Sequence, residues 1–261
     1  MKQEENLDGS KAPLVEHLTE LRSRLIRSVI AIGIAFVVCY IFSETIFNIL
    51  IGPYETAAGA EREIRFVFTA PQEYFFTQVR IAFFGALFLA FPVFASQIYM
   101  FMAPGLYRHE RAAFYPFLIA TPILFFLGAC LVYFLVMPLA LSFFLSLEQH
   151  EPGKAIIENL PKVSEYLSLI MSLIFAFGLV FQLPVVLTLL ARVNMISSDT
   201  LRNRRRYAIV ITFALAALLT PPDPASQIGL ALPTLLLYEV SIFCVKLVER
   251  QRERSMRDAE A

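Results

Sequence analysis

The sequence is poor in the residues and motifs that most enzymes use. Its three histidines lie in separate segments, and it contains no GxxxxGK[ST], HExxH or GxSxG motif, which argues against nucleotide hydrolysis, zinc proteolysis and serine hydrolysis. The three cysteines, Cys39, Cys130 and Cys244, lie in separate apolar runs without a CxxC pair, so we expect small buried side chains there. We predict a protein that is not an enzyme and has no cofactor or metal.

Charge is also missing from long stretches of the chain. Arg80 is the only charged residue between Glu73 and Arg108. Hydrophobic residues make up 57% of the sequence, and the mean hydropathy is +0.64, whereas ordinary globular proteins are about 45–50% apolar. The formal net charge is zero, which argues against nucleic acid as a partner. These features predict an all-α polytopic protein of the lipid bilayer.

Six apolar runs are candidates for membrane helices, and an amphipathic helix over 14–27 is expected to lead directly into the first. Crossing about 30 Å of hydrocarbon takes about 20 helical residues, so the last two runs are short. They form either two short spans or a re-entrant hairpin. The expected spans are about 25–46, 76–101, 114–145, 167–191, 207–219 and 228–245, in a single membrane domain over 14–245, with a flexible tail over 1–13 and a charged tail over 246–261.

The distribution of lysine and arginine predicts the orientation of the chain. Five of them precede the first span, two follow the second, five follow the fourth and five follow the last, whereas the other connections together carry four. The positive-inside rule therefore places both termini in the cytoplasm. The charged N-terminal segment has no cleavage-site pattern, so we expect no cleaved signal peptide.

Prolines inside the apolar runs predict bent helices, because each removes a backbone hydrogen bond. The bends favour a shaped helical bundle, and a concave scaffold is the more specific alternative. The prolines concerned are Pro92, Pro116, Pro122, Pro138, Pro184 and Pro233.

Several polar residues fall within or beside the apolar runs, where inserting a charge costs about 2.5–3.5 kcal/mol. Gln182 and Glu239 are placed deepest, so we expect them to face the interior of the protein or a cavity. Arg80 lies near the outer end of its span, where its long side chain can reach the interface. Gln97 and Asp223 are further candidates.

Two carboxylates, Glu20 and Glu110, lie among arginines in segments that the charge distribution places on the same side of the membrane. Exposed carboxylates beside arginines usually form solvated ion pairs worth less than about 1 kcal/mol. The alternative is that the two carboxylates form a binding site, and the spacing alone leaves both interpretations open.

Four strings resemble the twin-arginine translocase subunit family TatC: HLTELRSRL, APGLYRHER, YLSLIMSLIFAFGLVFQLP and LLTPPDPASQ, in this order. The resemblance implies a six-helix bacterial inner-membrane protein that receives folded proteins bearing twin-arginine signal peptides. It also implies several copies per complex, the small partner subunits TatA and TatB, and transport driven by the proton-motive force.

The resemblance assigns the reading of the signal peptide's arginine pair to Glu20 and Glu110. A guanidinium offers a planar fork of donors that suits a carboxylate, whereas a lysine ammonium is a point charge. Further positions that the resemblance implies for this site are Arg22, Phe101, Pro104, Leu106 and Tyr107, and those that it implies for the outer cap and for polar positions are Pro53, Phe75, Gln97, Tyr133, Asp223 and Glu239.

One position departs from the family pattern. This chain has Gln182 where many members have a glutamate, and glutamine forms hydrogen bonds but does not titrate. Obligatory proton transfer at this position is therefore in doubt.

Two other classes of function remain as alternatives. A small-solute secondary carrier would use ionisable groups such as Glu239 at the bilayer midplane together with internal repeats, but no clear repeat relates the two halves of the sequence. An intramembrane enzyme would need a catalytic set of residues at depth, and neither HExxH nor a paired intramembrane aspartate is present.

Overall fold

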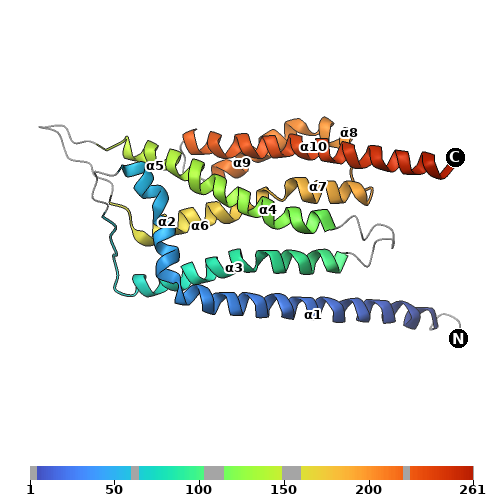
Figure 1. The fold of residues 1–261 in the computed structure, drawn as a ribbon, viewed down its shortest axis with the longest axis horizontal. Helices are drawn as coiled ribbons and strands as arrows, with labels where there is room; N and C mark the ends of the chain where they lie inside the picture. Colours follow the sequence, from blue (N-terminus) through green and yellow to red (C-terminus); the bar gives the residue numbers. More distant parts are fainter. Residues whose placement is uncertain (1–4, 60–64, 103–114, 149–159, 220–223, 261) are drawn as a thin grey trace, which may run out of the picture. The chain divides into compact units, whose positions relative to one another are not determined.

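The structure is a computed structural model that describes residues 5–59, 65–102, 115–148, 160–219 and 224–260. In these ranges all the regular secondary structure is helical (Figure 1). The only β-type pairing in them is an isolated bridge between Val67 and Lys162. The expected all-α class is therefore confirmed. The helices are α1 (Glu5–Ile41), α2 (Ser43–Ala58), α3 (Glu73–Met102), α4 (Tyr115–Leu131), the π-helical turn η3 (Val132–Val136), α5 (Met137–Leu145), α6 (Val163–Val180), α7 (Leu183–Arg192), α8 (Ser198–Asn203), α9 (Arg205–Leu219) and α10 (Pro224–Glu260).

By length and composition, the described part of the chain has five helical stretches that can cross a membrane. They are Leu18–Ile41, Glu73–Phe101, Pro116–Leu145, Val163–Arg192 and Ser226–Arg252. Helix α9 has 15 residues, so it is about 22 Å long, shorter than the hydrocarbon layer. It corresponds to the expected fifth run, which was correctly predicted to be short.

Helix α1 joins the predicted amphipathic segment to the first apolar run without interruption, as expected. It begins at Glu5, inside the segment that we expected to be a flexible tail. It ends at Ile41, because Phe42 forms a turn before α2, so the expected end at residue 46 is wrong. Ser43 and Glu44, which follow the turn, are residue types favoured at the start of a helix.

Two of the long apolar runs are interrupted beside a proline. In the third run, the Met137 N–H donates to the Val132 carbonyl, the π-helical pattern, directly before Pro138. The fourth run breaks at Phe181 and Gln182, and Pro184 lies in the first turn of α7. Proline lacks the N–H that a continuous helix requires. The disruptions predicted at Pro138 and Pro184 are therefore present, whereas α3, α4 and α10 continue through Pro92, Pro122 and Pro233.

The last helix corrects the prediction that the final two helices are both short. Helix α10 has 37 residues and continues to Glu260, well beyond the expected end at Val245. The residues that follow Val245 are rich in Lys, Glu, Arg and Gln, which favour helix even without apolar packing. Glu249 in this extension accepts hydrogen bonds from the backbone N–H (2.8 Å) and the hydroxyl (2.5 Å) of Ser198, which links it to the start of α8.

The chain forms two compact units, and the first comprises Met1–Ile46 and Gln78–Pro122. In this unit, Ala35 of α1 packs with Ala86 and Ala90 of α3 in a cluster of small buried residues. A Cβ atom added to Gly85 would lie 3.0 Å from the Cys39 Sγ atom. Small residues allow two helices to approach closely, so α1 and α3 pair through a narrow apolar seam.

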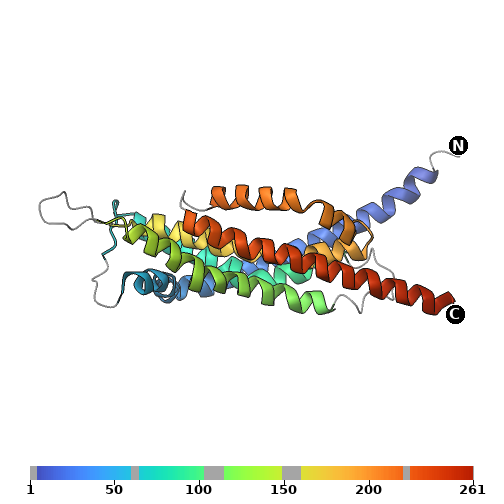
Figure 2. The same ribbon diagram turned by 90° about the horizontal axis from the view of Figure 1, so that it is seen from above.

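The second unit comprises Phe47–Thr77 and Ile123–Ala261. Here α10 packs against α5, α7, α8 and α9, and Figure 2 shows α9 running beside α10. Large side chains such as Phe125, Phe177 and Met137 are fully buried. Cys39 is buried, Cys244 is half-buried and Cys130 is exposed, so the expectation that all three cysteines are buried is wrong at Cys130 and only partly met at Cys244.

Candidate functional site

The carboxylate of Glu20 already binds a guanidinium within its own helix. Arg24, one helical turn further along α1, donates to Oε1 of Glu20 from Nε (3.1 Å) and from Nη2 (2.5 Å). The Arg24 side chain is 16% exposed and that of Glu20 is 33% exposed. The Ser28 hydroxyl donates to the Arg24 carbonyl at 3.1 Å. Glu20 is therefore an accessible carboxylate in a setting that suits an arginine.

The second predicted carboxylate, Glu110, lies outside the described residues, as do Pro104, Leu106 and Tyr107. The helices on either side of residues 103–114 are described. The hydroxyls of Tyr99 in α3 and Thr121 in α4 are hydrogen-bonded at 2.8 Å. This bond holds the two flanking helices together in the first unit.

The packing register of α1 and α3 shows which end of α3 lies nearest Glu20. Ala35 packs beside Ala86 and Ala90, and the two helices run in opposite directions (Figure 1). Glu20 precedes Ala35 by about 15 residues in α1. Because both helices rise equally per residue and run in opposite directions, the same level in α3 lies about 15 residues after Ala86 and Ala90. That level is at about Met102, so Glu20 lies at the level of the last turn of α3.

Three further predicted residues belong to the first unit. Arg22 is exposed on α1, and Phe101 is half-buried in the last turn of α3. The Oε1 atom of Gln97 is buried and has no hydrogen-bond partner among the described residues. A buried amide oxygen normally has a partner, so Gln97 is a polar position with unused acceptor capacity one turn before Phe101.

Pro53 and Tyr133 are linked through the Ile49 carbonyl, a connection that the sequence did not indicate although both residues were predicted to be functional. Pro53 lies inside α2 and has no N–H to donate to the Ile49 carbonyl, its normal helical acceptor. The Tyr133 hydroxyl donates to that carbonyl at 2.8 Å. A Cβ atom at Gly52 would lie 2.4 Å from the same hydroxyl. The Tyr133 hydroxyl therefore replaces the hydrogen bond that Pro53 cannot donate to the Ile49 carbonyl, and the missing side chain of Gly52 leaves room for that hydroxyl.

Phe75 is 56% exposed at the start of α3 and contacts the ring of Phe76, with centroids 5.6 Å apart. Its neighbour Glu73 accepts hydrogen bonds from the Thr69 N–H (2.7 Å) and the Ser164 hydroxyl (2.5 Å). These bonds fix the segment that precedes α3 against the start of α6.

An aromatic cluster with two buried tyrosines was also not predicted, because its members are distant along the chain. The rings of Tyr54, Phe66 and Tyr166 have centroids 5.1–5.6 Å apart. The Tyr166 hydroxyl donates to the Leu50 carbonyl at 2.9 Å. The cluster connects α2, the segment after it and α6 within the second unit.

Gln182 is buried, as predicted, at the break between α6 and α7. Its backbone N–H donates to the Leu179 carbonyl rather than to the Gly178 carbonyl. The side-chain Nε2 donates to the Gly178 carbonyl instead, at 3.3 Å. The side chain of Gln182 thus supplies a hydrogen bond that the break in the helix removes.

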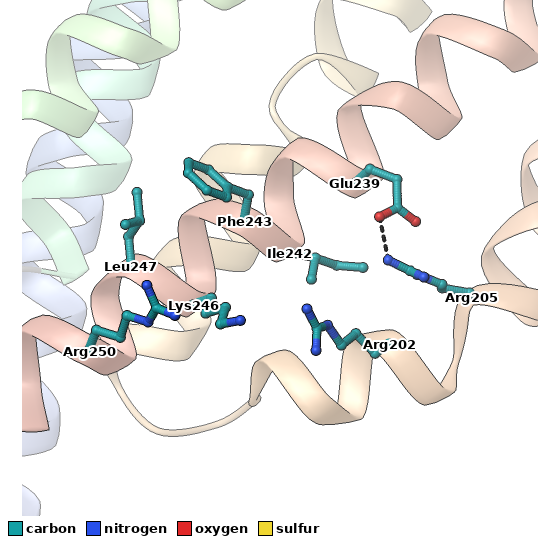
Figure 3. Close-up of a pocket in the computed structure, with 8 residues that line it drawn as sticks. All are labelled: Arg202, Arg205, Glu239, Ile242, Phe243, Lys246, Leu247 and Arg250. Carbon is teal, nitrogen blue, oxygen red and sulfur yellow. Dashed lines mark hydrogen bonds and ion pairs between the residues drawn. The ribbon is translucent and has the colours of Figure 1, made fainter.

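Glu239 does not occupy the interior position that we expected. Its side chain is 52% exposed and accepts a hydrogen bond from Arg205 Nη2 at 2.5 Å (Figure 3). The neighbouring Tyr238 hydroxyl donates to the Leu201 carbonyl at 2.9 Å. Glu239 therefore lies beside the junction of α8 and α9. Its partner is 34 positions away, so no local pattern indicated it, and Asp223, the other acidic candidate, lies outside the described residues.

The described residues contain no group of three or more His, Cys, Asp or Glu side chains that could hold a metal ion. What the first unit offers is a carboxylate that binds guanidinium, located level with the end of α3. Its chemistry is that of recognition by charge and hydrogen bonding.

Comparison with known proteins gives one consistent result. A family model described as "Sec-independent protein translocase protein (TatC)" matches residues 16–233. A protein of that name from Magnetococcus marinus is 49% identical over 257 residues, covering 98% of this chain and 92% of the relative. The namesake from Escherichia coli is 35% identical over 233 residues, covering 88% and 87%.

A solved structure has a similar fold. It is described as the crystal structure of the twin-arginine translocase receptor TatC, and it shares 38% identity with this chain at a TM-score of 0.75. The similarity covers 89% of this chain and 99% of the solved one. The agreement therefore extends over almost the whole of that molecule.

Proposed function

The chain belongs to the TatC family of Sec-independent protein translocase proteins, and we propose that it receives the twin-arginine signal peptides of folded precursor proteins and nucleates the translocation complex. As a member of this family it is a component of a protein transporter and not an enzyme. The proposed location is the bacterial inner membrane, and the proposed partners are the subunits TatA and TatB, with several copies per complex and transport driven by the proton-motive force.

The proposed readers of the arginine pair are Glu20 and Glu110. The observation that supports this role best is the hydrogen bonding of Arg24 to Glu20 through two guanidinium nitrogens. A signal-peptide arginine would make the same kind of contact with this carboxylate. An arginine is favoured over a lysine because its planar fork forms directed, charge-assisted bonds.

The remaining predicted residues would shape the site around these two carboxylates. Phe101 and Gln97 lie in the last two turns of α3, level with Glu20, and Arg22 is exposed on the same helix as Glu20. We propose that Pro104, Leu106 and Tyr107 complete the site together with Glu110. Pro53, with Tyr133 bonded to its helix, and the exposed Phe75 would shape the outer cap.

We further propose six crossings, with both termini in the cytoplasm. Five apolar helices are long enough to cross, so α9 would be the additional span. It runs beside α10, and a short helix can span a bilayer that thins locally at a cost of fractions of a kcal/mol per Å. An even number of crossings then agrees with the lysine and arginine distribution.

Site-specific photocrosslinking of a twin-arginine signal peptide tests the proposal. We expect Glu20→Ala and Glu110→Ala each to abolish crosslinking while the protein still inserts and accumulates. The matched control is Glu44→Ala, which removes an exposed carboxylate from the first unit at a position outside the proposed site. Undiminished crosslinking in both site variants would refute the assignment.

The alternative of a small-solute carrier gains no support. It required Glu239 as an ionisable group inside the protein at depth, but Glu239 is half exposed and paired with Arg205. The relatives described above are named as protein translocase components.

A further inference from the structure

A basic pocket lies between α8, the start of α9 and α10 in the second unit, and its lining includes none of the residues proposed to bind the signal peptide. Its volume is about 310 Å³, within the range of about 300–1,000 Å³ that is typical of ligand sites. Figure 3 shows Arg202 of α8 and Lys246 of α10 pointing toward each other across it. The cationic residues that line the pocket are Arg202, Arg205, Lys246 and Arg250.

Among the described residues, ion pairing neutralises one of the four cations of the pocket. Glu239 is the acidic residue of the lining, and it is paired with Arg205. Glu249, which is nearby in α10, accepts two hydrogen bonds from Ser198. Among the described residues no carboxylate lies within ion-pair distance of Arg202, Lys246 or Arg250. Three cations therefore face one hollow, and the part of the chain that the structure describes gives none of them a carboxylate partner.

Gathering three cations is unfavourable unless an anion offsets their repulsion. Two arginines and a lysine that approach from two helices suit a phosphate group in particular. Guanidinium groups bind phosphate oxygens with paired hydrogen bonds, and a lysine adds a compact charge. The pocket thus has the donors and the charge that recognise a phosphate anion.

The apolar side of the pocket indicates where that phosphate comes from. Phe243 and Leu247 also line it, and they are 64% and 43% exposed. Both lie in Ser226–Arg252, one of the stretches that can cross the membrane. Basic residues next to exposed apolar side chains at the end of a membrane helix are suited to a lipid headgroup and its acyl chains. Free phosphate would make no use of the apolar side chains.

We propose that this pocket binds the phosphate group of an anionic phospholipid at the membrane interface. The bound lipid would neutralise the cations and link α8 to α10. This inference does not depend on the proposed role of Glu20 and Glu110.

The test compares two double variants of the full-length purified protein that lose the same charge. Arg202→Gln/Arg250→Gln removes two pocket cations. Arg206→Gln/Arg252→Gln removes two exposed arginines from the neighbouring positions, and neither lines the pocket. Retention of phosphatidylglycerol and of phosphatidylcholine is measured by native mass spectrometry over a lipid titration, with inorganic phosphate as competitor.

We expect the pocket variant to bind phosphatidylglycerol at least about tenfold more weakly than the unmodified protein. The control variant is expected to change by less than about twofold, because Arg206 and Arg252 do not line the pocket and an isolated surface charge contributes little. Phosphatidylcholine should be retained poorly by all three proteins, and inorganic phosphate at the same concentration should not displace phosphatidylglycerol. This pattern supports a lipid phosphate site.

Three outcomes overturn the proposal. Equal weakening in both double variants would mean that binding follows general surface charge. Equal retention of phosphatidylcholine would mean that the anionic lipid is not selected, and displacement by equimolar inorganic phosphate would identify a free-anion site. If the double variant does not fold, Lys246→Gln alone applies the same test, because Lys246 is the half-buried cation of the pocket.

Discussion

The two compact units differ in how much apolar surface they bury within the chain. In Leu18–Ile41 of the first unit, 17% of the apolar 18-residue segment is buried within the protein. In Val163–Arg192 of the second unit, the buried share of the corresponding segment is 56%. The first unit packs through small residues such as Ala35 and Ala86, and the second through large ones such as Phe125 and Phe177. The first unit therefore leaves helical surface for lipid or partners, and the second has the more extensive core.

The largest expected effect comes from adding the same side chain to a glycine in each unit. In the second unit, a Cβ at Gly178 would lie 2.4 Å from Cε2 of Phe125, which is fully buried. Gly178→Val should lower the free energy of unfolding by about 3 kcal/mol, since overpacking a dense core forces side chains from their rotamers. Thermal unfolding of the purified protein in detergent measures this loss.

The matched variant in the first unit is Gly33→Val. A Cβ at Gly33 would meet no atom within 4 Å, and valine is somewhat better than glycine in a helix. We expect no loss of stability. Similar destabilisation by both variants would contradict the contrast between the two units.

The next effect concerns Gly52 and Tyr133 in the second unit. Gly52→Ala should cost about 1–3 kcal/mol, because the new Cβ would lie 2.4 Å from the Tyr133 hydroxyl. Tyr133→Phe removes that oxygen and leaves the ring carbon Cζ at 3.5 Å, but it also removes the hydrogen bond to Ile49, worth about 1 kcal/mol. The double variant should be no less stable than Tyr133→Phe alone. Additive losses in unfolding measurements would refute this coupling.

Much of the architecture was predictable from the sequence, because apolar runs and prolines act locally. The breaks beside Pro138 and Pro184 and the burial of Gln182 are as predicted. The length of α10 was underestimated because the apolar pattern stops at Val245, whereas charged residues continue the helix.

The contacts that were missed join residues distant in sequence. Tyr133 bonds the Ile49 carbonyl across 84 positions, and Arg205 reaches Glu239 across 34. Residues so far apart in the sequence do not form a helical or strand periodicity that would indicate the contact. The pair of Glu20 and Arg24, by contrast, has the four-residue spacing of helical neighbours, which could have been read directly.

A smaller effect is expected from breaking one ion pair in each unit. The pair of Arg205 and Glu239 joins two helices, with side chains 49% and 52% exposed, so Glu239→Gln should cost about 0.5–1 kcal/mol. Glu20→Gln breaks a pair within one helix and should cost about 0.3 kcal/mol. Unfolding of both variants under identical conditions tests the ranking, and a greater loss for Glu20→Gln would reverse it.

The smallest expected effect is a gain of function. Arg24→Gln removes the internal guanidinium from Glu20, and a pair of this type contributes about 0.3–0.5 kcal/mol. Crosslinking of a twin-arginine signal peptide should therefore rise by about twofold. Arg27→Gln removes a nearby exposed arginine of the same helix and should leave crosslinking unchanged. A decrease in the Arg24 variant would instead show that Arg24 supports binding.

The central claim is that Glu20 recognises a guanidinium of the signal peptide. The most direct test is the equilibrium affinity of two peptides, one with Arg-Arg and one with Lys-Lys, for the unmodified protein and for Glu20→Gln. We predict that the unmodified protein prefers the Arg-Arg peptide by about tenfold, as the loss of a directed charge-assisted bond would give, and that Glu20→Gln loses most of this preference. An undiminished preference in Glu20→Gln would contradict the claim.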